Sequence, residues 1–448
     1  METEPLLRFI VEPLLALPIS LPQRGSRLLL RDLHRQLRTA ITNGRLPPGA
    51  RLPSTRALAT SCGVSRNTAV AAYELLLSEG YVAARSGSGT RVADSLPLPL
   101  TITRLLSNRV LRKACSLPTL QADPQGQEPL RREIARYVAF SRAVSCEADD
   151  IIVTAGAQQA FGLLARVLVT PGRTTVALEE PGYAPLRASF SAAGARVSAV
   201  AVDAEGLIVD RLPRQSRVIC VTPSHQFPLG CVMSSRRRGE LLDFAQARRA
   251  VIVEDDYDGE FRYGDRPLDA LQTLDRASCV FYVGTFSKSL HPGLRLGYIV
   301  APAWARPALV AAKALADVCC CTLTQDTLAA MMAGGHLARH VRKMHRTYAG
   351  RREALLAGIR SECGAWFDAI PSAAGLHIAA VVKMPLDETL LVDEARKAGV
   401  QVHALGAQYA RRPLKRGLLF GYGAIEENAV AEGLTRLRRA LRAVNTTL

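Results

Sequence analysis

Residues 285–298 read Thr-Phe-Ser-Lys-Ser-Leu-His-Pro-Gly-Leu-Arg-Leu-Gly-Tyr and follow an apolar, strand-like run, Val280–Val283. Lysine is scarce in this chain, since 7 of its 57 basic residues are lysine, so composition alone does not explain Lys288. A Schiff base with an aldehyde cofactor needs a primary amine, which arginine cannot supply. Fixed donors for a phosphate come from nearby hydroxyl groups and a guanidinium, those of Thr285, Ser287 and Arg295. These residue types predict a site for pyridoxal phosphate (PLP), with a solvated lysine in a loop as the alternative.

A second part of the same site lies in Val251-Ile-Val-Glu-Asp-Asp-Tyr257, where a short apolar strand runs into acidic residues. Ligands of open α/β sheets bind at the carboxyl ends of strands. A carboxylate such as that of Asp255 can pair with a protonated pyridine nitrogen, and a phenol such as that of Tyr257 can hydrogen-bond the ring oxygen. The alternative is an acidic surface turn.

Two further segments suit the same cofactor. The first, Thr154-Ala-Gly-Ala-Gln-Gln159, follows the apolar strand Ile151–Val153 and opens a helical pattern that runs to Leu168. It therefore offers the free amides of a helix N-terminus to a phosphate. The second, Glu180-Pro-Gly-Tyr183, offers an aromatic face for stacking on a pyridine ring, although a lone tyrosine is more often half-buried packing.

With these four parts in chain order, residues from about 120 to 448 resemble the fold type I PLP-dependent aminotransferases. The resemblance implies an α/β fold with a mostly parallel sheet, helices on both faces and a small C-terminal α+β subdomain. It also implies that Lys288 carries the cofactor covalently and that Asp255 faces the pyridine nitrogen. Tyr257 would contact the ring oxygen, and Tyr183 would stack on the ring. The implied phosphate contacts are Gly156, Ala157, Gln158, Thr285, Ser287 and Arg295.

The sequence departs from the aminotransferase pattern at two places. Where such enzymes usually carry Asn-Pro-Thr-Gly, with the asparagine on the cofactor ring oxygen, this chain has Ser-His-Gln-Phe-Pro-Leu-Gly at 224–230. In the strand-like run 417–422, Leu419 stands about where aminotransferases place the arginine that clamps a substrate carboxylate. Losing that arginine would weaken amino-acid binding, unless a cation of the preceding loop replaces it, namely Arg411, Arg412 or Arg416.

The first ninety residues form a different, basic module. From Arg24 to Arg91 there are eleven arginines, no lysine and three acids, which suggests a polyanionic partner. Helical periodicity runs from Leu29 to Ile41, a second helix is predicted after a cap at Ser54, and a third opens near 65–68 and runs to about Glu79. The run 81–92 then predicts a β-hairpin wing. Two helices around a glycine-containing turn suit insertion of the second helix into a major groove.

Residues 27–92 closely resemble the winged helix-turn-helix domain of GntR-type transcription regulators. The resemblance implies that phosphates or bases are contacted by Arg51, Ser54, Arg56, Ser65, Arg66 and Thr68. It also implies that Gly87 and Gly89 shape a wing for the minor groove. For any single arginine in this set, a solvated helix face is the alternative.

The MocR/GabR regulators, which the chain resembles, consist of a GntR-like DNA-binding domain followed by an aminotransferase-like domain. We expect an N-terminal arm at 1–26, a DNA-binding domain at 27–92, a linker at 93–120 and a PLP-binding effector domain at 121–448. The family implies that the cofactor domain senses a small molecule, that the winged domains bind double-stranded promoter DNA, and that two chains form a head-to-tail, domain-swapped homodimer.

Composition sets limits on other classes of function. The chain has 448 residues, of which 48% are hydrophobic, so it can form one small domain and one large domain with an ample core. It contains no apolar run long enough for a membrane span and no secretion signal, which predicts a cytoplasmic protein that does not bind membranes. Ten cysteines without paired spacing predict free thiols, the run Cys319–Cys321 within a helical stretch predicts packing, and no metal site is expected.

Two functions from different classes remain. The favoured one is a PLP-dependent transcription regulator, not an enzyme, with residual half-transamination as the most activity expected. The second is a true aminotransferase that carries a DNA-binding domain. A repressor that has lost the cofactor is disfavoured by the complete set of cofactor residues. The sequence leaves open whether the effector is an amino acid, another amine or PLP itself, which gene is controlled, and in which direction.

Overall fold

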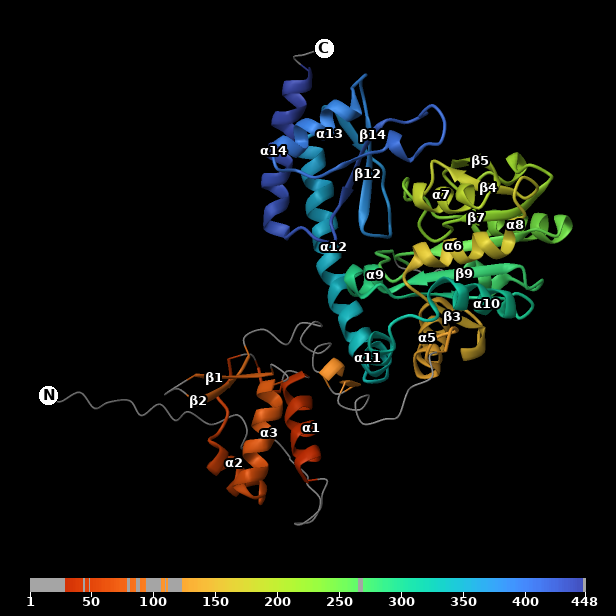
Figure 1. Cartoon of the computed structure of the whole chain (residues 1–448). Helices are drawn as coiled ribbons and strands as arrows, with labels where there is room; N and C mark the ends of the chain where they lie inside the picture. The colour runs from red at the N-terminus through yellow and green to blue at the C-terminus, as the bar shows by residue number, and fades with distance from the viewer. Residues whose placement is uncertain are drawn as a thin grey trace. The chain divides into compact units, whose positions relative to one another are not determined.

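A computed structural model of the chain describes residues 29–42, 45–47, 49–78, 81–85, 89–93, 106–108, 110–111, 123–264 and 269–445. The chain divides into two compact units, residues 1–117 and residues 118–448 (Figure 1). The expected N-terminal arm, most of the expected linker and Gly87 lie outside the described residues.

The small unit is a three-helix bundle with a hairpin. Its elements are α1 (Leu29–Thr42), α2 (Thr55–Cys62), α3 (Arg66–Ser78), β1 (Val82–Arg85) and β2 (Gly89–Val92). Strands β1 and β2 pair antiparallel, with Val82 opposite Val92. Buried residues of all three helices and the hairpin, among them Leu37, Leu58, Leu76 and Val92, form one core. The predicted winged helix-turn-helix is confirmed.

Local chemistry sets the bounds of α2 and α3. The Ser54 Oγ accepts a hydrogen bond from the Ala57 amide at 3.1 Å, which satisfies a free N–H of the first turn of α2. The helix ends at Gly63, whose φ of 64° is left-handed and suits glycine. The Ser65 Oγ accepts from the Thr68 amide at 3.0 Å and so starts α3. The turn between the two helices is therefore only three residues long, Gly63–Ser65.

The large unit is built on an eight-stranded sheet in the order β3-β10-β9-β8-β7-β4-β5-β6. Its strands are β3 (Ile151–Thr154), β4 (Thr175–Glu180), β5 (Arg196–Asp203), β6 (Gly206–Leu207), β7 (Ser216–Val221), β8 (Val251–Asp256), β9 (Val280–Thr285) and β10 (Gly297–Val300). Strands β9, β8, β7, β4 and β5 run parallel, while β10 is antiparallel to both β3 and β9, and β6 to β5. The inner strands β7 and β9 are largely apolar and buried along most of their length, as is typical of strands that are covered on both faces.

The helices of this sheet are α5 (Glu128–Arg142), α6 (Ala157–Leu168), α7 (Ala184–Ala192), α8 (Ser235–Arg248), α9 (Phe286–Ser289), α10 (Arg306–Asp317) and α11 (Thr322–Ala333). Phe161 of α6, Phe190 of α7 and Leu309 of α10 pack in one core, while Leu241 of α8 belongs to a separate core. One expectation is wrong, because Cys319–Cys321 lie between α10 and α11 and not inside a helix. All nine cysteines of the described segments are free.

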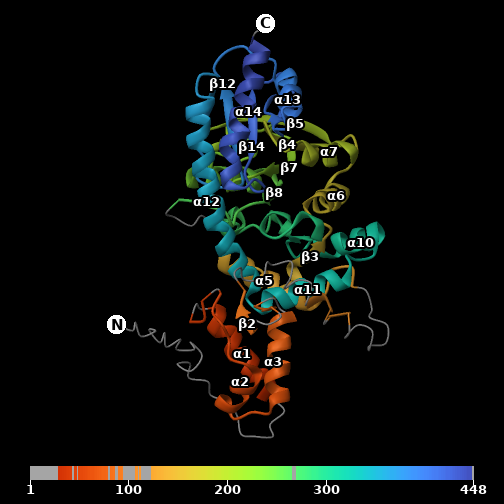
Figure 2. The ribbon, with the colours of Figure 1, turned by 90° about the vertical axis from the view of Figure 1, so that its left-hand side faces the viewer.

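The C-terminal part of the unit is an α+β subdomain. Its sheet has the order β11-β12-β14-β13 and is antiparallel throughout, with β11 (Phe367–Ala369), β12 (His377–Val382), β13 (His403–Ala404) and β14 (Gly417–Gly421). Helices α12 (His336–Glu362), α13 (Glu388–Lys397) and α14 (Glu427–Asn445) pack on it around a shared core. Figure 2 shows α12 running from the neighbourhood of α11 to this subdomain. Short 3₁₀ helices occur at Ala148–Asp150, Val209–Arg211, Leu271–Leu274, Pro292–Leu294 and Gly406–Gln408.

This architecture confirms the predicted fold class, and it brings the predicted cofactor segments together. Gly297 of β10 pairs with Thr154 on one side and with Thr285 on the other, so the ends of β3 and β9 meet at one edge of the sheet. Asp255 and Asp256 end β8 at the same edge, because β8 and β9 run parallel. The four segments, which lie between residues 154 and 298 of the sequence, therefore contribute to one cavity.

Candidate functional site

A cavity of about 640 Å³ opens at this edge of the sheet. Its lining contains nearly every residue that the sequence predicts for the cofactor: Ala157, Gln158, Tyr183, Asp255, Tyr257, Thr285, Ser287, Lys288 and Arg295. Gly156 is not part of the lining but directly precedes Ala157. Lys288 lies on the short helix α9 and is exposed to the cavity. The predicted residues are thus together in space, while their individual roles stay predictions.

One end of the cavity suits a phosphate. Gly156 caps α6 with a φ of 78°, and the Arg295 guanidinium packs against it, since a Cβ at this glycine would lie 3.1 Å from Arg295 Nη2. The same Nη2 donates to the Ala155 carbonyl at 3.0 Å, which holds the guanidinium group beside the N-terminus of α6. The Thr285 hydroxyl donates to Ser287 Oγ at 3.1 Å. Amides, hydroxyls and a guanidinium converge here, as anion binding requires.

The opposite end presents an unpaired acid. Asp255 is 4% exposed, and its Oδ1 has no hydrogen-bond partner among the described residues. Burial, together with the charges of Asp256, Asp258 and Glu179, raises the pKa of Asp255 well above its ordinary value. A protonated pyridine nitrogen would supply both the missing donor and the missing positive charge. The residues present therefore fit PLP.

Aromatic rings form the side wall of the cavity. Tyr183 and Phe227 meet edge to face, with ring centroids 5.6 Å apart, and Phe227 makes a similar contact with Tyr257 at 6.1 Å. Phe227 also lies 5.2 Å from the His377 ring. Tyr183 is 37% exposed, so its ring is available to a ligand in the cavity. The role of Tyr183 in stacking stays a prediction.

A buried cluster centred on His225 lies behind Tyr257, and the sequence did not predict it. His225 Nδ1 lies 3.0 Å from Asp258 Oδ2 and 2.8 Å from the Tyr257 hydroxyl, while Nε2 lies 3.0 Å from Ser372 Oγ. A Cβ at Gly375 would overlap the His225 ring, so glycine is needed there. The cluster joins the loop after β7, the end of β8 and the loop before β12. No spacing in the sequence could reveal contacts between three such distant segments.

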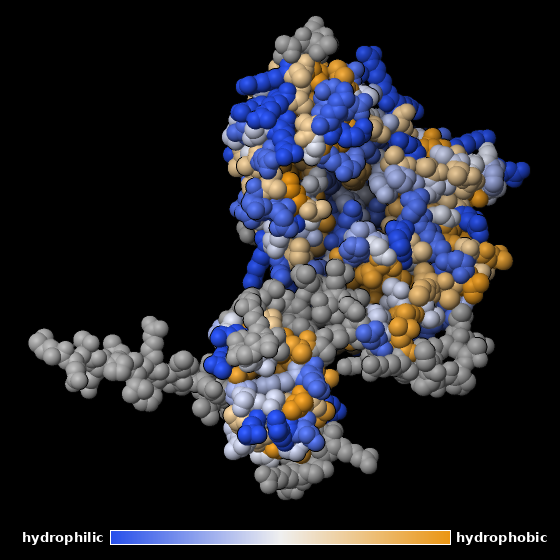
Figure 3. Space-filling model, turned by 60° about the vertical axis from the view of Figure 1, so that its left-hand side comes forward, coloured by the Kyte–Doolittle hydropathy of each residue, from blue (hydrophilic) through white to orange (hydrophobic). Residues whose placement is uncertain are grey.

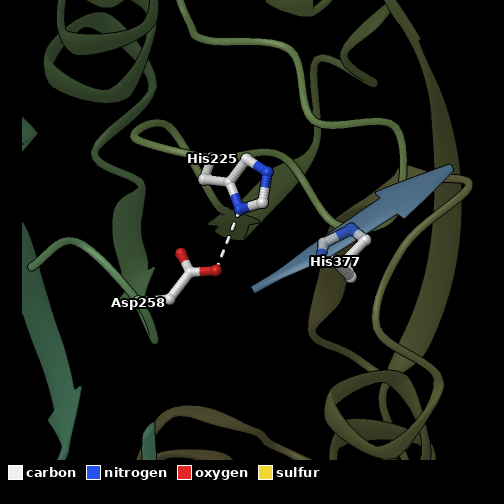
Figure 4. Close-up of side chains that lie close together, drawn as sticks. All are labelled: His225, Asp258 and His377. Atoms are coloured by element: carbon white, nitrogen blue, oxygen red, sulfur yellow. Dashed lines mark hydrogen bonds and ion pairs between the residues drawn. The ribbon is translucent and has the colours of Figure 1, made fainter. Parts of the chain in front are cut away.

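The same cluster is the group of side chains best placed for a metal ion. Ligand atoms of His225, Asp258 and His377 lie within 4.8 Å of one another, and His377 projects from β12 toward the other two (Figure 4). The sequence had predicted no metal site. In the structure the donor atoms are already engaged, because His225 bonds Asp258 and His377 Nε2 bonds the Pro228 carbonyl at 3.0 Å. Hydrogen bonding therefore accounts for the cluster.

Polar contacts hold the loop at 224–230, which replaces the aminotransferase Asn-Pro-Thr-Gly. Arg142, which no motif in the sequence had indicated, pairs with Asp256 at 2.6 Å and donates to Ser224 Oγ at 2.5 Å, and the side chains of Arg142 and Asp256 are both buried. The Gln226 amide donates to the Pro181 carbonyl at 2.8 Å. The loop is thus tied to α5, β8 and the turn after β4, which keeps His225 in place.

The position expected for a carboxylate clamp is apolar in space as well. Leu419 lines the cavity and is 5% exposed. It packs with Leu229, Ala379 and Leu405 in a small hydrophobic cluster. The three arginines considered as substitutes are exposed and are not part of the lining; they are Arg411, Arg412 and Arg416.

Most of the residues predicted to contact DNA lie on the surface of the small unit. Arg51, Ser54, Arg56, Ser65 and Arg66 are exposed, and Thr68 is half-buried. The hydroxyls of Ser54 and Ser65 cap α2 and α3, so these serines also have a structural role. The backbone of Arg51 forms an isolated antiparallel β-bridge with the backbone of Arg91 in the wing. The Arg51 side chain lies beside Gly89, whose φ of 79° favours glycine. Gly87 lies outside the described residues.

Comparison with known proteins finds relatives for both units. The model of the aminotransferase class I and II family matches residues 106–407, and that of the gntR family of bacterial regulatory proteins matches residues 29–92. The chain is 34% identical to the probable rhizopine catabolism regulatory protein MocR of Rhizobium meliloti, over 93% of this chain and 94% of that protein. It is 31% identical to the pyridoxine biosynthesis transcriptional regulator PdxR of Corynebacterium glutamicum, over 95% and 98%.

Among solved structures, the chain is similar to the α-aminoadipate aminotransferase LysN of Thermus thermophilus, solved with N-(5'-phosphopyridoxyl)-L-leucine. The TM-score is 0.72 at 27% identity, over 78% of this chain and 90% of that one. Among the helices that the structure describes, none combines the length and the apolar character needed to span a bilayer.

Proposed function

We propose that this protein is a PLP-dependent transcription regulator that binds promoter DNA. The chain belongs to the MocR/GabR-type regulators, which join a GntR-type DNA-binding domain to an aminotransferase-like domain. We propose that its ligand is a small amine, an amino acid or PLP itself and acts at the Lys288 cavity. The observation that carries this reading is the combination of a complete cofactor constellation with Leu419 in place of a carboxylate clamp. A regulator needs binding and a change of shape, whereas an enzyme needs turnover.

The cofactor would be held by the residues described above. Lys288 would provide the primary amine, Asp255 would pair with the pyridine nitrogen, and Tyr183 would stack on the ring. When bound, PLP supplies an aldehyde that joins amines and a ring that accepts electrons. Gly156, Ala157, Gln158, Thr285, Ser287 and Arg295 would hold the phosphate. The Gln158 amide already donates to Ser189 Oγ at 2.8 Å, so its contribution would come through the backbone.

Replacing Asp255 with asparagine is expected to have two opposite effects. Cofactor affinity should fall by roughly 1.5 to 3 kcal/mol, because a charge-assisted hydrogen bond is lost. Cofactor-free protein should become more stable, because an unpaired buried carboxylate is removed. Burial raises the pKa of Asp255 in the folded protein, whereas in the unfolded chain this carboxyl has its ordinary pKa of about 4. The Asp255 carboxyl therefore lowers the stability of the folded protein as the pH rises above about 4. The gain in stability should therefore be absent below that pH and present at neutral pH.

Thermal unfolding of cofactor-free protein across this pH range, with spectroscopic titration of PLP, measures both effects. Asp243→Asn, at an exposed position on α8, is the matched control and should change neither quantity. Unaltered cofactor affinity in Asp255→Asn would contradict the proposed role.

We propose that His225 orients the Tyr257 hydroxyl toward the cofactor ring oxygen. The Asp258 carboxylate favours the tautomer of His225 that is protonated at Nδ1, so the ring donates on that side. The single Nδ1 hydrogen is shared by the Asp258 carboxylate and the Tyr257 oxygen, which both accept it, so the hydrogen of the tyrosine hydroxyl is free to donate into the cavity. His225 would thus act through Tyr257, in place of the asparagine of aminotransferases.

The His225→Ala variant should therefore shift the pH midpoint of the visible absorption change of bound PLP by about one unit, the equivalent of one hydrogen bond. Tyr257→Phe should cause a shift of the same sign, and the double variant should add little to it. Additive shifts in the double variant would mean that His225 does not act through Tyr257.

We propose a homodimer, as the family resemblance implies. Phe140 on α5 is 95% exposed, and Leu315 and Val318 at the end of α10 are 83% and 58% exposed. Figure 3 shows hydrophobic side chains gathered on the part of the large unit farthest from the C-terminus. Such apolar exposure supports association of two copies. Domain exchange between them, and action in the cytoplasm, remain part of the proposal.

A second candidate function is a true aminotransferase that carries a DNA-binding domain. The observation that favours it is the cofactor constellation itself, which would also serve transamination. Leu419 argues against it, because an amino-acid carboxylate would lack a clamp. We propose that any amine chemistry is slow or confined to a half-reaction. Steady-state assays with amino-acid and keto-acid pairs decide between the two functions.

A further inference from the structure

The inner face of the small sheet forms the wall of the cavity opposite the cofactor residues. Leu419 of β14 pairs with Ala379 of β12 and with His403 of β13, and Gly421 pairs with His377. Cross-strand partners and residues two apart share a face of a sheet, so these five side-chain positions lie on one face. Four of the five line the cavity: His377, His403, Leu419 and Gly421. This face holds no arginine or lysine in the structure as described.

Charge in the cavity is unfavourable to a carboxylate. Among the described residues of the lining, the Lys and Arg side chains are those of Lys288 and Arg295, which the cofactor would use. Asp255 and Asp258 also line the cavity, but Asp255 would pair with the pyridine nitrogen of the cofactor and Asp258 is hydrogen-bonded to His225. Burial lowers the pKa of His377 to about 3, so this ring is neutral at physiological pH. A carboxylate bound here would be desolvated without a cation of its own.

The remaining wall is aromatic and apolar. Phe227 lies between Tyr183, Tyr257 and His377, with ring centroids 5.2 to 6.1 Å away. Leu376 and Leu419 complete the lining on the side of the small sheet. Such a wall stabilises an aromatic or aliphatic body by contact and by edge-to-face packing.

We propose that the effector is a primary amine with an aromatic or aliphatic body and no carboxylate, bound beside Lys288 against the wall that contains Phe227 and Leu419. This inference rests on the proposed function, because it names the ligand of the same site. It narrows the three ligand classes that remained open to one.

Matched pairs that differ only by the carboxylate test the proposal in the PLP-loaded protein. The pairs are phenethylamine with phenylalanine, and butylamine with norvaline. Titration follows the visible absorption of the bound cofactor, and operator affinity is measured in parallel. Each amine should bind at least about ten-fold more tightly than its amino acid, the factor expected from one unpaired buried charge. Equal or tighter binding of the amino acids would overturn the proposal, and would mean that a cation outside the lining reaches the carboxylate.

Leu419→Arg provides the reverse test. Because it adds a guanidinium on the inner face, it should gain at least about ten-fold in affinity for phenylalanine and lose affinity for phenethylamine. Leu419→Met conserves volume without adding charge, so this variant should still bind phenethylamine more tightly than phenylalanine, as the wild type is expected to do. Thermal unfolding checks that both variants fold, and the wild-type pairs decide the question if Leu419→Arg does not. An unchanged order of preference in a folded Leu419→Arg protein would count against the proposed position of the ligand.

Failure of this inference is distinguishable from failure of the proposed function. If amino acids bind in preference to amines and still change operator affinity, the inference is wrong and the regulator remains. If the protein takes up no PLP and no ligand changes operator affinity, the proposed function is wrong and the inference falls with it.

Discussion

Replacing Lys288 with alanine is expected to abolish the response of operator binding to amine ligands while leaving basal operator binding largely intact. Lys288 is the primary amine of the cavity, and a ligand can switch DNA binding only through different affinities for two conformations. Without this amine the cofactor can be held by its phosphate and ring contacts but has no covalent link to the protein. The difference between the free and liganded states is then lost.

Operator affinity, measured by fluorescence anisotropy with and without ligand, gives the first readout. Borohydride reduction followed by peptide mapping gives the second, since wild-type protein should carry cofactor fixed to Lys288 and the variant should not. Lys343→Ala, on α12 and not in the lining of the cavity, is the matched control. An undiminished ligand response in Lys288→Ala would contradict the account.

The Arg66→Ala variant is expected to weaken specific operator binding by about 1 to 3 kcal/mol, roughly 5- to 150-fold, if this side chain reads a base edge. Arg66 is the first residue of α3 and is exposed, just after the turn that Gly63 and Ser65 define. In helix-turn-helix proteins the start of the second helix lies deepest in the major groove. The loss should therefore be larger on the operator than on unrelated DNA.

Titrations on operator and unrelated fragments over a range of salt concentrations separate the two kinds of contact. We propose that Arg56, which is exposed on α2, contacts a phosphate, so Arg56→Ala should weaken binding on both fragments and lower the salt slope by about one. Arg35→Ala on α1, where Arg35 is paired with Asp32, removes the same charge elsewhere and should have a small effect. Equal operator binding by wild type and Arg66→Ala would exclude this docking.

The sequence was most informative where chemistry is local. The capped helices of the small unit follow from Ser54, Gly63 and Ser65, because each cap involves residues three or four positions apart. The strands of the large sheet follow from continuous apolar runs, and the cofactor segments follow from residue types that few sites combine. A resemblance to known families then supplied the order of these parts.

Contacts between segments that are far apart in the chain could not be predicted from the sequence. The His225 cluster connects residues up to 147 positions apart, and Arg142 reaches Asp256 across 114 positions. Nothing in the local pattern distinguishes these side chains from surface histidines and arginines. The replacement of the clamp by Leu419 could be read from the sequence, but the charge of the whole cavity required the register of β12, β13 and β14.

The most direct test of the account measures operator affinity and amine turnover in the same PLP-loaded preparation. We expect an amine ligand to change operator affinity by about five-fold or more, a typical coupling between two sites, while turnover is slow or stops after a half-reaction. Steady-state transamination of an amino acid at ordinary enzyme rates, about 1 to 10³ per second, with operator affinity unchanged by any ligand, would contradict it and establish the aminotransferase instead.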